Sequence, residues 1–480
     1  MYCLDNKYFI KLCLLHNKEI TPWRLSVDII DMLDKKGFFD APDDSVSAED
    51  YIKTHRVCDF YCKSGNLLRI VYLKFVKALL GKFKSVEELD YFIWRHLIYA
   101  IAPDYLTAEL LRKQFYRNSK FDLSVELGHI YVRGKGKYVP KELEGMKFDV
   151  VIGNPPYNND MYLDFVELGH KMAKDYSLWI TPAKFVAKKE LSSLYPYMVN
   201  FTFYPEAQEI FDIRNLDGIA YYLIGKTVQS TCLVCNKIKK VECFNTCDNI
   251  PFSSIKSCNL FTNTLVNKLG TYTSLGHRLN LLQSPFGVSK DVRGVSAKDD
   301  EHPYHLLAGK QGSNIDDRGW IESNKVTNSL GMVAKYKVCV NTMMGNCFYD
   351  KQGTTLGLNA TFIYKPYEVT PHPYLCLMAF DTYEEAVNFD RFLNTRFIKF
   401  LLFTAICSQN NTTKLNWRFV PDLGTFDKFY EDRPLKGYED KVDSNGEYTD
   451  KNGVVHCSLY KKYDLTDYEM DVIDSIIRER

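Results

Sequence analysis

The sequence lacks the features that mark several large classes of protein. Its 480 residues carry a formal net charge of only +1, so it is no uniformly basic nucleic-acid binder, and any affinity for DNA must come from local patches. No apolar run approaches the roughly 20 residues of a membrane span, and charged residues interrupt residues 1–19, unlike the core of a signal peptide. We therefore expect a soluble, intracellular protein without a membrane partner.

The cysteines also lack a recognisable framework. All 14 are scattered over a long chain, which favours free thiols in a reducing compartment. Cys232, Cys235, Cys243 and Cys247 are spaced somewhat like zinc ligands. A strand over residues 231–237 would, however, turn the first two to opposite faces, so we predict no metal site.

The most informative stretch is residues 148–157. Phe148 to Gly153 reads as a buried parallel strand, and Asn154-Pro155-Pro156-Tyr157 follows at its carboxyl end. The two prolines fix two φ angles and remove two backbone donors, which leaves rigid carbonyl acceptors beside an aromatic ring. This combination suits a planar group that carries an amine, although a proline-rich turn alone would read similarly. We predict that these four residues are catalytic.

The residues before this stretch predict alternating strands and helices. A helix begins at Thr21-Pro22, with Thr21 as its cap, and ends at Gly37. Residues 56–80 read as strand, tight loop and helix, and residues 97–116 as a second strand and helix. Such alternation predicts an α/β protein with a doubly wound parallel sheet.

The composition changes near residue 270, where short strands and turns replace long helices. We predict a catalytic domain over residues 1–255 and a mixed α+β domain over 256–430. Residues 431–480 would hold a flexible insertion, at 439–455, and a C-terminal helix.

The motifs occur in a familiar order: Thr21-Pro22-Trp23, Asp59 to Asn66, Tyr99 to Ala102, then Asn154 to Tyr157. This order resembles the gamma-type, adenine-specific amino-methyltransferases of type II restriction–modification systems, in particular a bacterial and phage branch. The resemblance implies a Rossmann-like catalytic domain, S-adenosylmethionine as cofactor, and methylation of N6 of an extruded adenine in double-stranded DNA. It also implies a cytoplasmic monomer, with a separate restriction endonuclease as a possible partner.

The resemblance also assigns roles to residues. Tyr157 would stack on the extruded base, and Tyr221 or Tyr222 would cover its other face, unless that residue is an ordinary core tyrosine. Lys63 and Ala102 depart from the commoner pattern, which has a glycine and an acid there, and Asp104 could replace that acid. The implied cofactor-binding residues are Thr21, Pro22, Asp59, Tyr61, Cys62, Ser64, Gly65, Asn66 and Ala102.

The second half would be the target-recognition domain, because the first offers nothing suited to reading several base pairs. Polar and basic side chains there could reach base edges and phosphates, although they would also suit a solvated scaffold. The basic connection from Arg133 to Lys147 is a second candidate for DNA contact. The predicted DNA-contacting residues are Lys290, Arg293, Lys310, Lys414 and Arg418.

Three alternatives remain open at this point. The same motif serves methylation of the exocyclic amine of cytosine, and a related one serves protein glutamine, although without a long second half. A DNA-binding or anti-restriction protein that has lost catalysis would fit Lys63 and Ala102 but not an intact Asn154–Tyr157. Methylation at a cytosine carbon is excluded, because the sequence has no Pro-Cys pair.

Overall fold

The structure is a computed structural model of the whole chain. It describes residues 21–116, 128–134, 138–204, 207, 211, 218–237, 244, 246–309, 315–343, 354–405 and 412–478. The chain divides into two compact units, which are described separately below. Unit 1 comprises residues 1–238 and 245–255, and unit 2 comprises residues 239–244 and 256–480.

Unit 1 is built on one large sheet. Among the described residues this sheet has nine strands, in the order β3-β2-β1-β4-β5-β7-β6-β8-β9. The strands are β1 (Val57–Asp59), β2 (Ile98–Ala102), β3 (Ile130–Val132), β4 (Phe148–Gly153), β5 (Ala173–Pro182), β6 (Met198–Tyr204), β7 (Ile219–Ile224), β8 (Cys232–Asn236) and β9 (Cys247–Ile250). The helices are α2 (Trp23–Asp34), α3 (Ala48–Thr54), α4 (Asn66–Leu79), α5 (Val86–Phe92), α6 (Tyr105–Phe115), α7 (Tyr162–Met172) and α8 (Lys184–Lys188).

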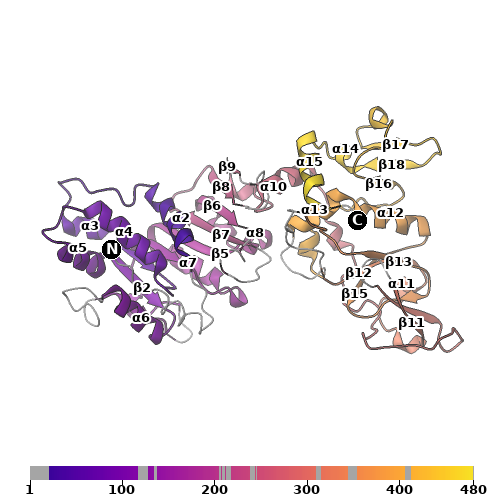
Figure 1. Cartoon of the computed structure of the whole chain (residues 1–480), viewed down its shortest axis with the longest axis horizontal. Helices are drawn as coiled ribbons and strands as arrows, with labels where there is room; N and C mark the ends of the chain where they lie inside the picture. Colours follow the sequence, from indigo (N-terminus) through magenta and orange to yellow (C-terminus); the bar gives the residue numbers. More distant parts are fainter. Residues whose placement is uncertain are drawn as a thin grey trace. The chain divides into compact units, whose positions relative to one another are not determined.

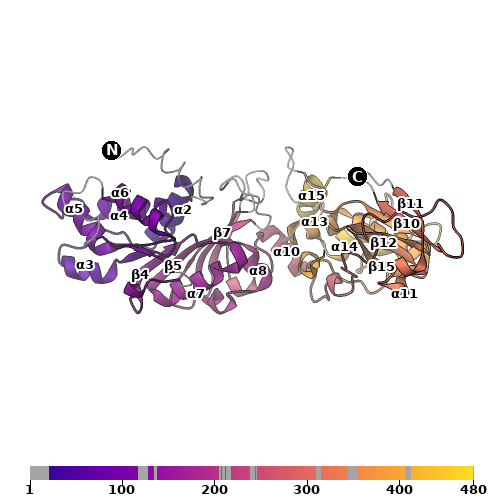
Figure 2. The ribbon, with the colours of Figure 1, turned by 90° about the horizontal axis from the view of Figure 1, so that it is seen from below.

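Neighbouring strands from β3 to β5 are all parallel, whereas β7 runs antiparallel to both β5 and β6. The central strands β1, β2 and β4 are buried along their whole length, which agrees with their continuous apolar runs. Figure 2 shows α2, α4 and α6 on one face of the sheet and α7 and α8 on the other. The predicted doubly wound, mostly parallel α/β sheet is confirmed.

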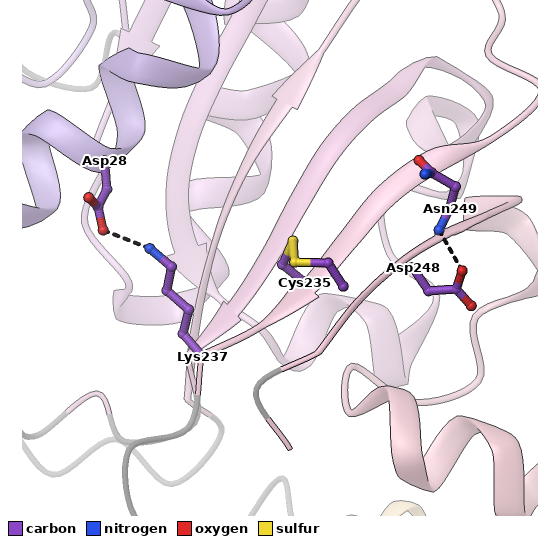
Figure 3. The surroundings of a disulfide bond; sticks show 6 residues. Asp28, Cys235, Lys237, Asp248 and Asn249 are labelled. Atoms are coloured by element: carbon purple, nitrogen blue, oxygen red, sulfur yellow. Dashed lines mark hydrogen bonds and ion pairs between the residues drawn. A yellow bond between two sulfur atoms is a disulfide. The ribbon is translucent and has the colours of Figure 1, made fainter. Parts of the chain in front are cut away.

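At one edge of the sheet, two cysteines depart from the expectation of free thiols, which holds for the other described cysteines. β8 and β9 pair antiparallel, and a disulfide joins Cys235 to Cys247 directly across them (Figure 3). Beside it, Lys237 forms an ion pair with Asp28 of α2, with Nζ 2.7 Å from Oδ2. The two cysteines are 12 residues apart in the sequence and meet only because the hairpin folds back.

Unit 2 contains smaller sheets, in agreement with the predicted mixed α+β character. Its described residues form three three-stranded sheets, in the orders β11-β10-β14, β13-β12-β15 and β16-β18-β17. Figure 1 labels the strands of the last two sheets. The strands are β10 (Tyr304–Gly309), β11 (Ile315–Ile321), β12 (Tyr336–Asn341), β13 (Thr361–Tyr364), β14 (Glu368–Val369), β15 (Tyr374–Phe380), β16 (Phe429–Glu431), β17 (Glu447–Thr449) and β18 (Val455–Ser458). The helices are α10 (Leu260–Lys268), α11 (Leu330–Val333), α12 (Tyr383–Asn394), α13 (Arg396–Ala405), α14 (Leu459–Lys462) and α15 (Asp467–Ile476).

Residues 439–455 are not the flexible insertion that their charge and Asn-Gly pairs suggested. They contain β17 and lead into β18, which pairs antiparallel with β17 and parallel with β16. Tyr448 of β17 packs on His456 of β18, with ring centroids 4.9 Å apart, and both side chains are buried. Aromatic burial therefore orders a segment whose average composition reads as loop.

Among the described residues, none of the helices combines the length and the apolar character needed to cross a lipid bilayer.

Candidate active site

The predicted cofactor loop and the predicted catalytic motif follow two neighbouring central strands of the large sheet, at their carboxyl ends. β1 pairs with β2 on one side and with β4 on the other, so the chain order reverses beside β1. The loop after Asp59 and the turn after Gly153 therefore leave neighbouring parallel strands at their carboxyl ends. Ligands of open α/β sheets bind at such a reversal.

Backbone hydrogen bonds hold the loop after β1 in place. The N–H of Phe60 donates to the carbonyl of Ile152 in β4, and the N–H of Cys62 donates to that of Ile101 in β2, each at 2.9 Å. The loop ends at Gly65, whose φ of +74° lies in the left-handed region. A Cβ there would lie 2.2 Å from the ring of Phe115, so the loop approaches α6 as closely as a glycine allows.

Asp59 is the acid of this loop. Its side chain is only 3% exposed, and its Oδ1 accepts a 3.0 Å hydrogen bond from the N–H of Tyr61. Burial raises the pKa of the Asp59 carboxyl to about 7, although this hydrogen bond acts in the opposite direction. A buried carboxyl that titrates near neutrality is well placed to respond to a cationic ligand.

The amide of Asn154 is held between two hydroxyls. Its Nδ2 donates to Oγ1 of Thr21 at 3.0 Å, and its Oδ1 accepts from the hydroxyl of Tyr157 at 3.0 Å. Pro155 is buried, whereas Pro156 and Tyr157 are half-buried beyond the carboxyl end of β4. The structure thus brings Asn154 and Tyr157 of the predicted catalytic set together.

Thr21 does not cap a helix, in contrast to the prediction from the sequence. α2 begins at Trp23 with Pro22 before it, and no side chain caps its first turn. The carbonyl of Thr21 accepts a 2.8 Å hydrogen bond from Nδ2 of Asn66, the first residue of α4. Sequence reasoning missed the contacts of Thr21, because its partners lie 45 and 133 positions further along the chain.

Two polar groups of α4 have no hydrogen-bond partner among the described residues. Oδ1 of Asn66 is buried and unsatisfied, and so is Nη2 of Arg69, whose guanidinium lies 5.9 Å from the ring centroid of Phe115. Ser64 is also buried, and Lys63 extends over the ring of Tyr61, with Nζ 5.5 Å from the centroid. Buried unsatisfied groups beside a close-approach glycine are typical of a ligand site.

The end of β2 is where the commoner pattern has an acid, and Ala102 is fully buried there. Asp104 is a poor replacement for that acid, because its carboxylate already has a partner within the chain. Its Oδ1 accepts a 2.8 Å hydrogen bond from the N–H of Thr107 and caps α6.

Tyr222 is a core residue, and its predicted role in base stacking is wrong. It lies in β7 with no exposed surface, and its ring packs against Phe185 and Phe201 at centroid distances of 5.3 and 6.0 Å. Its hydroxyl accepts from Oγ1 of Thr181 at 3.3 Å. A ring enclosed in this way has no free face for a base.

The predicted DNA-contacting residues of unit 2 fall into different environments. Lys290, Arg293 and Lys414 are exposed. The side chain of Arg418 is not available for DNA contact as predicted. Its Nη1 donates to the carbonyl of Ala405, at the end of α13, and to that of Leu415. Lys310 lies outside the described residues, as do Lys135 and Lys137 of the basic connection. Of that connection, Arg133 lies over the rings of Tyr138 and Phe165, 5.7 and 5.6 Å from their centroids.

The cysteine set considered from the sequence does not form a zinc site in the described residues. Cys235 and Cys247 are bonded to each other, Cys232 is a buried free thiol, and Cys243 lies outside the described residues. In the described part of the chain, no group of three or more histidine, cysteine, aspartate or glutamate side chains could hold a metal ion.

Comparison with known proteins relates the middle of unit 1 to a family of methylases. Residues 82–215 match the family described as "Eco57I restriction-modification methylase". The matched segment contains β2 to β6 and Asn154–Tyr157, while the loop from Asp59 to Asn66 lies before it. None of the curated proteins matches the sequence.

Several solved structures are similar in part. The EcoKI M protein of a type I restriction enzyme is 12% identical with a TM-score of 0.30, and covers 42% of this chain and 50% of its own. The type IIL enzyme MmeI, solved with DNA, is 9% identical with a TM-score of 0.41, and the match covers 88% of this chain and 69% of MmeI. The type ISP enzyme LlaGI, solved as a nuclease-deletion mutant with a DNA substrate mimic, is 10% identical with a TM-score of 0.44. The match covers 98% of this chain and 66% of the LlaGI chain. The chain thus spans about half the length of the EcoKI M protein.

Proposed function

We propose that this protein is an adenine-specific DNA methyltransferase of a restriction–modification system. It moves a methyl group from S-adenosylmethionine to N6 of an adenine that has left the duplex, in the cytoplasm of a bacterial or phage-infected cell. The observation that best supports this proposal is the position of Asn154-Pro155-Pro156-Tyr157. The four residues follow β4, next to the β1 loop, and lie inside the segment that is similar to restriction–modification methylases.

The residues around the β1 loop fit the methyl donor. Asp59 offers a buried carboxyl for its ammonium group, Asn66 an unsatisfied amide oxygen, and Gly65 a backbone without a side chain at the closest approach. When bound, the donor supplies a methyl group on a positively charged sulfur. The other cofactor-contacting residues of the proposal are Thr21, Pro22, Tyr61, Cys62, Ser64 and Ala102.

Asn154 and the carbonyl of Pro155 would accept the two hydrogens of the target amine. An exocyclic amine conjugated with its ring is a weak nucleophile, and acceptors on both hydrogens favour a nitrogen whose lone pair points out of the ring plane. Because the sulfonium methyl is already activated, positioning can account for much of the rate. Tyr157, half-buried and fixed through its hydroxyl, would stack on the extruded base.

Unit 2 would then read the target sequence. In support of this proposal, Lys290, Arg293 and Lys414 are exposed on a unit that contains none of the proposed chemical groups. With a net charge of only +1, such local positive charge must supply the attraction to phosphates.

The direct test is incubation of the protein with labelled S-adenosylmethionine and DNA of mixed sequence, followed by mass spectrometry of the nucleosides. We expect label in N6-methyladenine. Label confined to cytosine would support the cytosine-amine alternative, and label confined to protein would exclude a DNA methyltransferase. A protein that binds DNA but transfers no methyl group would be the catalytically lost form.

A further inference from the structure

Thr21 is hydrogen-bonded to both halves of the proposed site. Its hydroxyl accepts the amide N–H of Asn154, and its carbonyl accepts the amide N–H of Asn66. All three residues are buried, with exposed fractions of 7%, 3% and 7% for Thr21, Asn154 and Asn66. Water therefore cannot easily replace a lost partner, and each of these bonds has a structural consequence.

The two ends of an asparagine amide have nearly the same shape but opposite hydrogen-bonding character. The oxygen carries two lone pairs, whereas the nitrogen carries two donors and no acceptor. A target amine presents N–H donors, so only the orientation with Oδ1 toward it is productive. With Nδ2 bound to Thr21, Oδ1 of Asn154 keeps one lone pair for the hydroxyl of Tyr157 and one for the target amine.

We propose that Thr21 is a positioning residue for methyl transfer, whose hydroxyl binds Nδ2 of Asn154 and so fixes the amide side chain where its Oδ1 can accept a hydrogen bond from the target amine. This inference rests on the proposed function and adds to it a residue that acts through Asn154. Thr21 is itself fixed by Asn66, which borders the methyl-donor loop, so the two halves of the site share one rigid connection. The segment before α2 thereby takes part in the chemistry as well as in donor binding.

The test uses three substitutions at one position. Thr21→Val keeps the shape and removes the hydroxyl, Thr21→Ser keeps the hydroxyl, and Thr21→Ala removes the hydroxyl without a branched side chain if the valine variant does not fold. Thr262→Val is the matched control, since Thr262 is fully buried in α10 and its Oγ1 has no hydrogen-bond partner among the described residues. Thermal unfolding of each variant checks its folding.

Two quantities separate positioning from donor binding. The single-turnover rate of methylation, at saturating DNA and S-adenosylmethionine, reports the orientation of Asn154, and calorimetry with S-adenosylhomocysteine reports the donor site. We expect Thr21→Val and Thr21→Ala to lower the single-turnover rate about tenfold or more even when the donor is saturating, so that any loss of donor binding in the calorimetry does not account for the slower rate. Thr21→Ser should restore most of the rate, and Thr262→Val should behave as the wild type does.

Two results would overturn the inference and leave the proposed function standing. One is an unchanged single-turnover rate in the valine and alanine variants. The other is a tenfold weaker S-adenosylhomocysteine complex with an unchanged rate at saturation, which would make Thr21 a donor contact alone. A wild-type protein that methylates nothing would instead overturn the proposed function, and this inference with it.

Discussion

At the scale of single residues, the proposed site is a place where polar groups are buried at a cost. Asp59, Asn66 and Asn154 are at most 7% exposed, and Asn66 has an amide oxygen without a partner among the described residues. Burying a polar group without a hydrogen bond costs roughly 1–3 kcal/mol. Oδ1 of Asn66 and Nη2 of Arg69 are buried without such a bond among the described residues, and a ligand bound at the β1 loop would be able to satisfy them.

Asn154→Ala removes the proposed acceptor of the target amine and leaves the β1 loop untouched. We expect turnover to fall at least about a hundredfold, on the scale of losing one oriented hydrogen-bonding group at a reacting centre. Binding of S-adenosylhomocysteine, measured by calorimetry, should stay within about threefold of the wild type. Loss of that binding in a folded variant would show that Asn154 belongs to the donor site.

Asp59→Asn should change how stability depends on pH. Because burial raises the pKa of Asp59 from 3.8 to about 7, the folded protein favours the protonated carboxyl. This stabilisation is fully present below pH 4 and is lost as the pH rises to about 7, by up to about 4 kcal/mol. The asparagine variant cannot ionise there, so its free energy of unfolding should fall less over this range.

Denaturant unfolding between pH 4 and 8, without ligand, measures the difference between the variant and the wild type. Asp248→Asn is the control, since Asp248 lies exposed on β9. Parallel pH profiles for wild type and Asp59→Asn would mean that Asp59 does not titrate near neutrality.

At the scale of elements, the edge of the large sheet depends on a covalent bond as well as on strand pairing. β9 is mostly exposed and, among the described residues, has a partner strand on one side only, which is a weak position for a strand. The disulfide closes the β8–β9 hairpin beside the ion pair of Lys237 with Asp28 (Figure 3). Cross-linking at this point limits how far the hairpin can open when the chain unfolds.

Cys235→Ser should lower the free energy of unfolding by about 3 kcal/mol under non-reducing conditions, as expected for a closed loop of this length. Dithiothreitol should lower the stability of the wild type by a similar amount and leave the variant unchanged. Cys258→Ser is the control, because Cys258 is not in a disulfide. Alkylation of both Cys235 and Cys247 in the folded, unreduced protein would contradict the bond.

At the scale of the whole molecule, the proposed chemistry and the proposed recognition belong to different units. Unit 2 has a core of its own, which includes Phe286, Leu306 and Tyr364. Unit 2 also includes residues 239–244, which lie between β8 and β9 in the sequence. The ring of Phe244 packs against those of Phe261 and Phe400, at centroid distances of 5.3 and 6.4 Å. An exchange of units must therefore exchange this loop as well.

A chimera tests the assignment of recognition to unit 2. Residues 256–480 and 239–244 would be replaced together by those of a relative that methylates a different site, with a second chimera that keeps the native loop as control. Long-read sequencing of DNA from expressing cells gives the methylated sites. We expect the site to follow the donor of unit 2, with better expression of the chimera that carries the matched loop. A site that follows unit 1 would move recognition to that unit, with the connection from Arg133 to Lys147 as the first candidate.

The sequence by itself determined those features of the fold that depend on residues close together in the chain. The apolar run before Asn154 predicted β4, the small loop before Asn66 predicted α4, and the regular alternation of the two predicted a parallel sheet. Two prolines and an aromatic ring in four residues also predict an amine as substrate, and this stays a prediction. These signals are local, since strand pattern, turn chemistry and helix start are each set within about ten residues.

Only the tertiary structure decided where distant residues meet. It joined Thr21 to Asn154, enclosed Tyr222 in the core, turned Arg418 back onto the end of α13, and bonded Cys235 to Cys247. In each case the side chain contacts a partner that cannot be identified from the residues near it in the sequence. A local pattern shows which face of an element is buried, whereas the partner on that face depends on how the whole chain packs.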